Sequence, residues 1–376
     1  MPADRLAADR AAGPERTINQ SVSRWIHRKR APQRVGARRR SAASLPAPAE
    51  EKIAFWKGIS VMHGPMANAA LIDRLNQASV NHINFPLVTL PFDEAPGEQS
   101  YWMPPELTTL YGTAVWDELS EDQKIDLSQK EFALICSISC NGEKEAIGDI
   151  AKIMLKSKFE SVRSYLSHLI REENNHIDMF VEFCNRYGEL TRFRYFYTKG
   201  DQCTDPAFND LLAFIHLLVF EELGDNINRV MARDKSLPPL VRAINKLHAE
   251  EEARHIAFGR HIVTELATEL SRKISANQTR KLHDYVYSHI HTRHYEYHNM
   301  RIYSSIGIDN AFSLRERLVL ERDASFFFRT ESDPHTPLKK ILTFLHSIGL
   351  ISDAQLHEPP RQMLNVERAA ETLCAR

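Results

Sequence analysis

Two stretches of the chain carry the same arrangement of glutamate and histidine. Residues 172–177 read Glu-Glu-Asn-Asn-His-Ile, and residues 251–256 read Glu-Glu-Ala-Arg-His-Ile, 79 positions further along. In each stretch the second glutamate precedes the histidine by three positions, which on a helix places both side chains on one face. Carboxylate and imidazole together suit iron or manganese better than metals that seek thiolates. Each stretch is therefore a candidate half of a metal site.

A further glutamate precedes each stretch at nearly the same distance. Glu143 lies 30 residues before Glu173, and Glu221 lies 31 residues before Glu252. That distance is about what a chain needs to run down one helix, turn, and climb the next. Each upstream glutamate is therefore expected opposite its own Glu-x-x-His pair. Four carboxylates and two imidazoles so arranged form the site for two iron or two manganese ions in ferritin-like bundles.

The repeat makes this pattern more specific than a single copy would be. A chain with 17 histidines is expected to contain about one Glu-x-x-His by chance, yet the only two copies here are the two members of the repeat. Both copies interrupt an apolar helical stripe, where an uncompensated carboxylate would be costly and a bound cation is a common compensation. The alternative is that these side chains form ion pairs on the surface of amphipathic helices.

Four long helices are expected to position these residues. Apolar side chains recur at three- and four-residue spacing over residues 121–156, after a start signal that ends at Ser120, and again over residues 159–187. A third helix is expected to start at Pro206, and a fourth follows the prolines at 238–239. Ionisable side chains interrupt the apolar stripe of all four helices, so polar groups are expected inside the bundle.

The composition favours an all-α protein and excludes several classes of function. Among 376 residues there are only 14 glycines, and the 48 basic side chains balance the 49 acidic ones. Few glycines favour long helices over many short strands, and the balanced charge gives no sign of a nucleic-acid partner. Because no run of about 18 apolar residues occurs, no membrane span is expected.

The cysteines and the two ends of the chain complete the outline. The five cysteines are odd in number and form no Cys-x-x-Cys pair, so neither a disulfide framework nor a thiolate zinc site is indicated, and a cytoplasmic location is expected. Residues 1–50 hold eleven basic side chains against four acidic ones and read as a disordered basic tail. The helical domain is expected over 51–350, followed by a C-terminal tail over 351–376.

The fourth helix carries a further histidine that directs attention to one family. Residues 248–255 read His-Ala-Glu-Glu-Glu-Ala-Arg-His, which contains the pattern His-x-x-x-Glu-x-x-His. In this pattern, and in the doubled Glu-x-x-His, residues 100–300 resemble the p-aminobenzoate N-oxygenase family of ferritin-like di-iron oxygenases. The resemblance implies a ferritin-like bundle with additional helices and a site with three histidines. The implied ligands are Glu143, Glu173, His176, Glu221, His248, Glu252 and His255.

Two of these ligands have a neighbour that could replace them. Glu145 could take the place of Glu143, although its helical neighbours are polar whereas those of Glu143 are apolar. Glu222 could take the place of Glu221, since both have apolar neighbours and only the resemblance favours Glu221. His248 is expected to share a metal ion with Glu221 and His255.

The resemblance implies a di-iron enzyme that uses O2 to N-oxygenate the primary amine of a small molecule, giving a hydroxylamine, nitroso or nitro product. Two iron ions, cycling between Fe2+ and Fe3+, are the expected cofactors, with manganese as the alternative. The chain shows no Gly-x-Gly-x-x-Gly segment for a flavin or nicotinamide, so electrons are expected from an external donor or reductase. Bundles of this kind often pair with a twin, which leaves a homodimer open.

Other functions share the same ligand set. A C–H hydroxylase or desaturase acting on a small or carrier-bound substrate would use the same oxygen-activating centre with a different pocket. A non-catalytic ferritin-like iron-binding protein would share the bundle.

Two further groups of residues in the chain give weaker signals. Cys136, Ser139 and Cys140 are expected to be small core residues that let helices approach. A stretch rich in histidine and tyrosine has no neighbouring inward acid, so we interpret it as the end of an amphipathic helix, with a second metal site as the alternative. Its members are Tyr287, His289, His291, His294, Tyr295 and His298.

Overall fold

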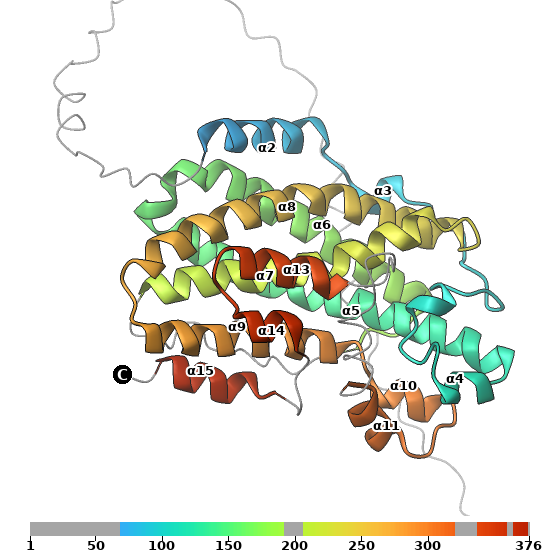
Figure 1. Cartoon of the computed structure of the whole chain (residues 1–376). Coiled ribbons are helices and arrows are strands. Elements are labelled where there is room, and N and C mark those ends of the chain that lie inside the picture. Colours follow the sequence, from blue (N-terminus) through green and yellow to red (C-terminus); the bar gives the residue numbers. More distant parts are fainter. Residues whose placement is uncertain (1–67, 192–205, 320–336, 359–363, 375–376) are drawn as a thin grey trace, which may run out of the picture. The chain divides into compact units, whose positions relative to one another are not determined.

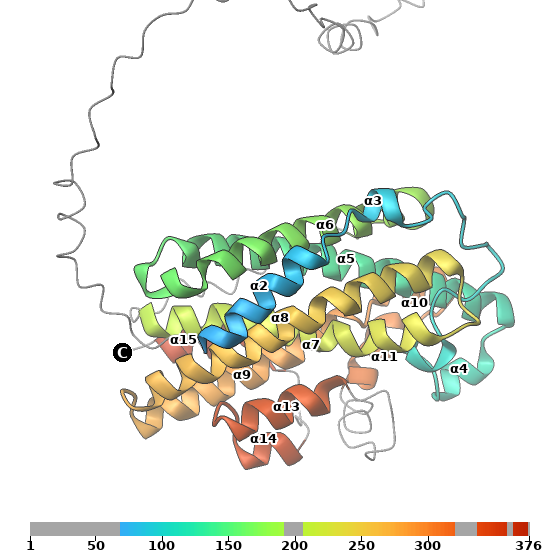
Figure 2. The same cartoon turned by 90° about the horizontal axis from the view of Figure 1, so that it is seen from above.

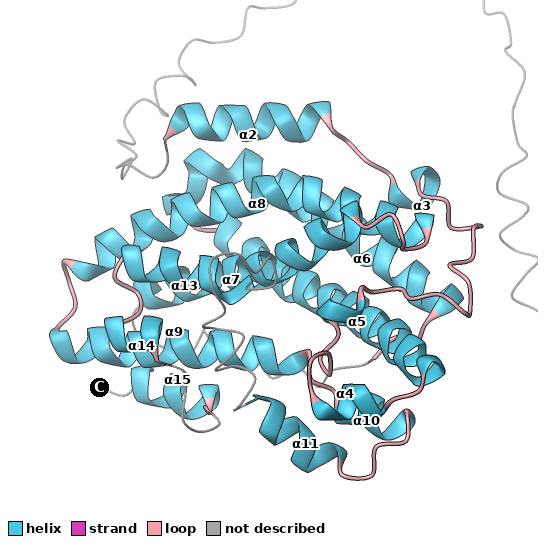
Figure 3. Ribbon diagram, turned by 45° about the vertical axis from the view of Figure 1, so that its right-hand side comes forward, coloured by secondary structure: helices cyan, strands magenta, loops and turns pink. Residues whose placement is uncertain are grey.

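The computed structural model of the protein describes residues 68–191, 206–319, 337–358 and 364–374. Every regular element in this part of the chain is a helix, as Figure 3 shows by colour. The prediction of an all-α protein is therefore confirmed.

Four of the described helices are long and form the bundle. They are α5 (Glu121–Met154), α6 (Arg163–Tyr187), α7 (Pro206–Arg233) and α8 (Pro239–Ser271). Both Figure 1 and Figure 2 show them running side by side. Their bounds agree with the predicted helices to within a few residues, except that a short 3-10 helix, η3 (Ser157–Val162), precedes α6.

The helix starts follow the local sequence signals. The Ser120 side chain accepts a hydrogen bond from the backbone N–H of Gln123, whose own side chain bonds back to Ser120, so α5 begins with a capping box. Helix α8 begins with Pro239 at its first position, where the missing N–H costs no helical hydrogen bond.

Two apolar clusters fill the bundle, one on each side of a layer of ionisable side chains. On α5 the buried apolar residues of one cluster end at Cys140 and those of the other begin at Ala146. On α8 the corresponding boundaries are Leu247 and Phe258. The predicted site residues of both helices lie between these limits, so apolar packing seals the layer from both ends.

Shorter helices surround the bundle, as the resemblance implied. Those that precede or cover it are α2 (Ala69–Asn81), α3 (Pro86–Thr89), η2 (Pro105–Leu107), α4 (Ala114–Glu118), α9 (Ala276–Glu296), α10 (Met300–Ser305), α11 (Ala311–Arg317) and α13 (Pro337–Ser347). Helix α3 contacts α6, and α13 contacts α7. A ferritin-like bundle with additional helices is thus what the chain forms.

The C-terminal region differs from the tail expected over 351–376. It contains α14 (Asp353–His357) and α15 (Val366–Cys374), and α15 packs on α9. Val366, Ala370 and Leu373 are buried in the same apolar cluster as the bundle helices. The core therefore extends past residue 350.

The remaining expectations have mixed outcomes. Cys136 and Cys140 are free, buried thiols, as expected of small core residues, whereas Cys374 forms a disulfide that the cysteine pattern had not indicated. No described helix combines the length and apolar character needed to cross a lipid bilayer. The basic tail predicted over 1–50, and the start of the helical domain at residue 51, lie outside the described residues.

Candidate metal centre

The seven predicted ligands lie together in the middle of the bundle. Each is almost fully buried, with relative exposures of 0–2%. Their ligand atoms form two groups, within each of which all atoms lie within 4.8 Å of one another. One group is Glu143, His176, His248 and Glu252, and the other is Glu173, Glu221, Glu252 and His255. Burial contradicts the alternative of ion pairs on the protein surface.

Glu252 and Glu173 join the two groups because each presents one oxygen to either side. Glu252 Oε1 lies 3.1 Å from His176 Nδ1 and 3.0 Å from His248 Nε2, while its Oε2 is 2.8 Å from His255 Nδ1. Glu173 Oε2 lies 3.0 Å from His176 Nδ1, and its Oε1 is 3.2 Å from His255 Nδ1. Glu143 completes the first group, with Oε1 3.3 Å from His248 Nε2.

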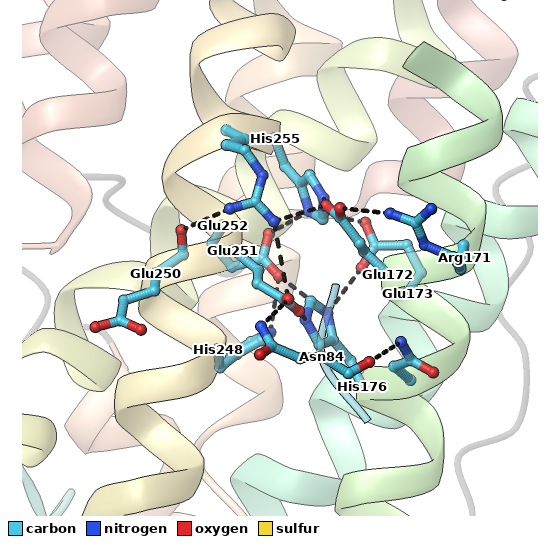
Figure 4. A network of polar contacts seen from close by, with 12 residues as sticks. Asn84, Arg171, Glu172, Glu173, His176, His248, Glu250, Glu251, Glu252 and His255 are labelled. Atoms are coloured by element: carbon cyan, nitrogen blue, oxygen red, sulfur yellow. Dashed lines mark hydrogen bonds and ion pairs between the residues drawn. The ribbon is translucent and has the colours of Figure 1, made fainter. Parts of the chain in front are cut away.

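The first glutamate of each Glu-Glu-x-x-His stretch has a role that the sequence analysis did not assign. Glu251 Oε2 accepts a hydrogen bond from His176 Nε2 at 2.8 Å, and Glu172 Oε2 accepts one from His255 Nε2 at 2.9 Å. The contacts cross between the stretches, because each glutamate holds the histidine of the other helix (Figure 4). The doubling of glutamate in both stretches was the available signal. Such carboxylates orient an imidazole and fix which nitrogen faces a metal.

These two outer carboxylates are themselves held by different groups (Figure 4). Arg254 Nη2 lies 3.0 Å from Glu172 Oε2, and Arg171 Nη2 lies 3.2 Å from Glu172 Oε1, so a guanidinium group contacts each oxygen of this carboxylate. Glu251 accepts a hydrogen bond of 2.5 Å from the side-chain amide of Asn84, which comes from the segment between α2 and α3. The segment between α2 and α3 thus helps to position Glu251, which in turn holds His176.

The electrostatics favour positive charge at the centre. Burial raises the pKa of both Glu143 and Glu221, and the facing carboxylates of Glu173 and Glu252 raise it further. Burial by itself would lower the pKa of His255, but the surrounding carboxylates outweigh it and hold that pKa well above its usual range. The same balance raises the pKa of His176.

The donor set fits a pair of metal ions. Glu143 Oε2 and Glu221 Oε1 are buried oxygens without a hydrogen-bond partner, although a buried carboxylate ordinarily requires one. Four carboxylates and three imidazoles converge here, which is the ligand chemistry that iron and manganese favour. The four negative charges of the ionised carboxylates balance the four positive charges of two divalent cations.

The two alternative glutamates contact arginines instead of this cluster. Glu145 forms an ion pair with Arg293 of α9. Glu222 pairs with Arg260 Nε at 2.5 Å. Both therefore face away from the group that contains their neighbours.

The expected grouping of His248 with Glu221 and His255 was wrong. His248 lies with Glu143 and His176, and its ring centroid is 4.7 Å from that of His176. Position on the helix explains the difference, since His248 is two turns before His255 and therefore reaches the other end of the metal centre.

The stretch rich in histidine and tyrosine lies at the C-terminal end of a helix, as predicted, but that end is not amphipathic because none of its residues is exposed. It belongs to α9, where His289, His291 and His294 are buried. His289 stacks on His216 of α7 with ring centroids 4.2 Å apart. Among the residues the structure describes, these histidines do not form a group of three or more ligands, so the alternative of a second metal site gains no support.

A small hollow with a cavity volume of about 20 Å³, the space of roughly one water molecule, lies between α5, α7 and α9. Gly142 and Phe220, the residues that precede Glu143 and Glu221, line it together with Arg293. The Phe220 ring covers Gly142 so closely that any Cβ at residue 142 would overlap it.

The model of the p-aminobenzoate N-oxygenase AurF family matches residues 66–308, which is more than half of the chain. The chain belongs to this family. The matched region of the N-oxygenase family contains all seven clustered residues and both outer glutamates.

Individual relatives add little about activity. The chain is 32% identical over 114 residues to an uncharacterized protein of Mycobacterium bovis and, at the same identity, to uncharacterized proteins of two strains of Mycobacterium tuberculosis. These matches cover 29% of this chain and 33% of each relative, so the chain spans about a third of the length of the curated relatives it matches. No solved structure matches the chain.

Proposed function

We propose that the buried cluster holds two iron ions, with manganese as the alternative. Glu143, His176 and His248 would bind one ion, Glu221 and His255 the other, and both ions would contact Glu173 and Glu252. The observation that carries this proposal is the convergence of four buried carboxylates whose oxygens lack sufficient hydrogen-bond partners. Cation binding is the ordinary compensation for such a cluster.

We propose that the protein is an oxygenase, and that its reaction is N-oxygenation of a primary amine of a small molecule. Family membership supports the reaction class. Bound iron would supply the activation of O2. The product would be a hydroxylamine, or a nitroso or nitro compound after further oxidation, and the electrons would come from an external donor.

The residues of this chain supply the setting for that chemistry. The two apolar clusters exclude water from the ionisable layer, which strengthens the electrostatic contacts inside it. Glu172 and Glu251 hold the Nε2 protons of His255 and His176, so the Nδ1 atoms of both rings face the metal centre.

Metal analysis combined with product analysis tests the proposal. Protein purified from iron-replete cells should contain about two iron atoms per chain. Incubation with reductant, O2 and a panel of aryl and aliphatic amines should yield hydroxylamine, nitroso or nitro products by mass spectrometry. The reduced protein should consume O2 faster when an amine is present.

Other metal contents or reaction products would indicate a different function. One zinc and no iron per chain would contradict the metal centre. Two irons with hydroxylated or desaturated carbon products would indicate the hydroxylase or desaturase alternative. Iron uptake with no amine-dependent O2 consumption would indicate a non-catalytic iron-binding protein.

A further inference from the structure

Two histidines of the centre are held from behind by carboxylates. His176 Nε2 donates to Glu251, and His255 Nε2 donates to Glu172. An ionised carboxylate only accepts hydrogen bonds. It therefore keeps the proton on Nε2 of each ring, which leaves Nδ1 as the nitrogen available to a metal ion.

The third histidine is held by a neutral amide instead. Asn228 of α7 is buried, and its Nδ2 lies 2.6 Å from Nδ1 of His248. With Nδ2 as donor, Nδ1 accepts and the imidazole proton lies on Nε2. That nitrogen is 3.3 Å from Glu143 Oε1 and 3.0 Å from Glu252 Oε1, so it donates toward the carboxylates.

An asparagine amide offers a second state in the same space. Rotation by half a turn about its terminal bond exchanges Nδ2 for Oδ1, which accepts a hydrogen bond. Nδ1 of His248 would then carry the proton and donate it to Oδ1, and Nε2 would keep a free lone pair. The ring need not move, because Asn228 holds Nδ1 in both states.

We propose that Asn228 is a positioning residue whose amide orientation decides whether His248 binds the metal ion or donates a hydrogen bond to Glu143 and Glu252. This inference rests on the proposed metal centre. It makes His248 the reversible ligand of the centre, in contrast to His176 and His255. Release of His248 would open a coordination position beside Glu143 without unfolding any helix.

Anaerobic titration with Fe2+ or Co2+ tests this role without measuring turnover. Asn228→Leu keeps the approximate volume but removes both hydrogen-bonding states. It should weaken one of the two metal sites by about 10–100-fold, the range typical of groups that orient a ligand. Asn228→Asp can only accept while ionised, so it should hold the proton on Nδ1 and restore binding at least to the wild-type level. The Co2+ absorption spectrum of Asn228→Asp should show the same nitrogen ligation as wild type.

The matched control is Asn245→Leu. Asn245 is also buried and lies on α8, but its Nδ2 donates to the backbone oxygen of Val241 at 2.8 Å. This variant should keep both metal sites. A loss in Asn245→Leu equal to that in Asn228→Leu would show a general packing effect and overturn the proposal.

A double-mutant cycle with His248→Ala separates positioning from other effects. Without His248, Asn228→Leu and Asn228→Asp should each change metal affinity by less than about twofold. Effects that persist without His248 would mean that residue 228 acts directly on the cluster, and would overturn the proposal. Wild-type protein that binds no metal would overturn the metal centre itself. Wild-type binding with unchanged variants would overturn only the role of Asn228.

Discussion

At the scale of single residues, each histidine of the two Glu-Glu-x-x-His stretches depends on the glutamate that opens the other stretch. Glu251 orients His176, and Glu172 orients His255. Replacing either outer glutamate should therefore weaken metal binding by the group that contains the histidine it supports. The loss of metal affinity should exceed that caused by removing an exposed charge.

Glu251→Gln tests this crossed support. The substitution keeps the size of the side chain but removes the charge that holds the Nε2 proton of His176. Iron affinity should fall by about 10–100-fold, measured by anaerobic Fe2+ titration. Glu250→Gln is the control, because the Glu250 side chain is 65% exposed and contacts Lys246. Equal affinities in the two variants would contradict the crossed arrangement.

His248→Ala tests the third histidine directly. The variant should lose most of its affinity for one metal ion, and oxygenation should fail, while the second ion stays bound by the Glu221 and His255 group. His261→Ala is the control on the same helix, since His261 lies outside the cluster and accepts a hydrogen bond of 3.0 Å from the backbone N–H of Asn68. Two irons per chain and undiminished turnover in His248→Ala would remove His248 from the ligand set.

At the scale of elements, the approach of α5 to α7 depends on a missing side chain. Gly142 lies under the ring of Phe220, and each of these residues precedes a glutamate of the cluster. The space that a side chain would occupy is therefore filled by the neighbouring helix. Close packing of this kind leaves little room for adjustment.

Gly142→Ala should separate the two helices locally. The added methyl group overlaps Phe220, so overpacking should cost about 1–3 kcal/mol of unfolding free energy, and metal affinity should fall with it. Gly224→Ala on α7 is the control, because the nearest atom to its new Cβ would be 3.8 Å away. Chemical denaturation of both variants gives the comparison. An unchanged unfolding free energy in Gly142→Ala would show that Phe220 moves aside at no cost.

The histidines of α9 make a different contribution from those of the metal centre. Burial, together with the nearby His294, lowers the pKa of His291 to about 3. The folded state therefore keeps this ring neutral, whereas the unfolded chain takes up a proton near pH 6.5. Stability from His291 is present above pH 6.5 and is lost as pH falls toward 3.

His291→Leu should isolate this effect. The free-energy advantage of wild type over the variant should shrink by up to about 2 kcal/mol between pH 6.5 and pH 5. Urea denaturation in the presence of a chelator measures it. The pKa values of His176 and His255 are raised, so their contributions to the unfolding free energy change only above pH 6.5 and stay constant in this window. A difference between the two proteins that is constant with pH would refute burial of a neutral His291.

At the scale of the whole molecule, the ionisable layer lies between two apolar clusters, and the C-terminal helices extend one of them. Val366, Ala370 and Leu373 of α15 belong to the same cluster as Phe214 and Phe258. The contacts described for the metal centre, by contrast, come from residue 84 onward. Removal of the C-terminal end should therefore affect stability, whereas removal of the N-terminal end should leave the metal centre unchanged.

Truncation at either end tests this difference. Deleting residues 351–376 removes buried Val and Leu side chains, each of which contributes about 1.5–3 kcal/mol, so thermal stability should fall markedly. Deleting residues 1–45 should leave metal content and helical content per residue unchanged, by metal analysis and circular dichroism. Loss of metal in the N-terminal truncation would show that this tail supports the centre.

Local sequence patterns were sufficient for the helices and for the chemical type of the cluster. Three-residue spacing puts Glu173 and His176 on one helical face whatever surrounds them. The prolines at 238–239 and the cap at Ser120 likewise act within a few residues of the helix start. The repeat distance then predicted which helices face one another, because about 30 residues suffice to finish one helix, turn, and reach the same level on the next.

Only the tertiary structure decided how side chains pair between helices. Neighbouring positions such as Glu221 and Glu222 differ by about 100° around the helix axis, and the apolar neighbours of both left the choice open. The rotation of each helix in the bundle places Glu222 against Arg260 and brings His248 to Glu143. That rotation is set by packing of many residues across the bundle, which no local spacing records. For the same reason the crossed glutamates, the contact of Asn228 with His248 and the burial of the α9 histidines became visible only in three dimensions.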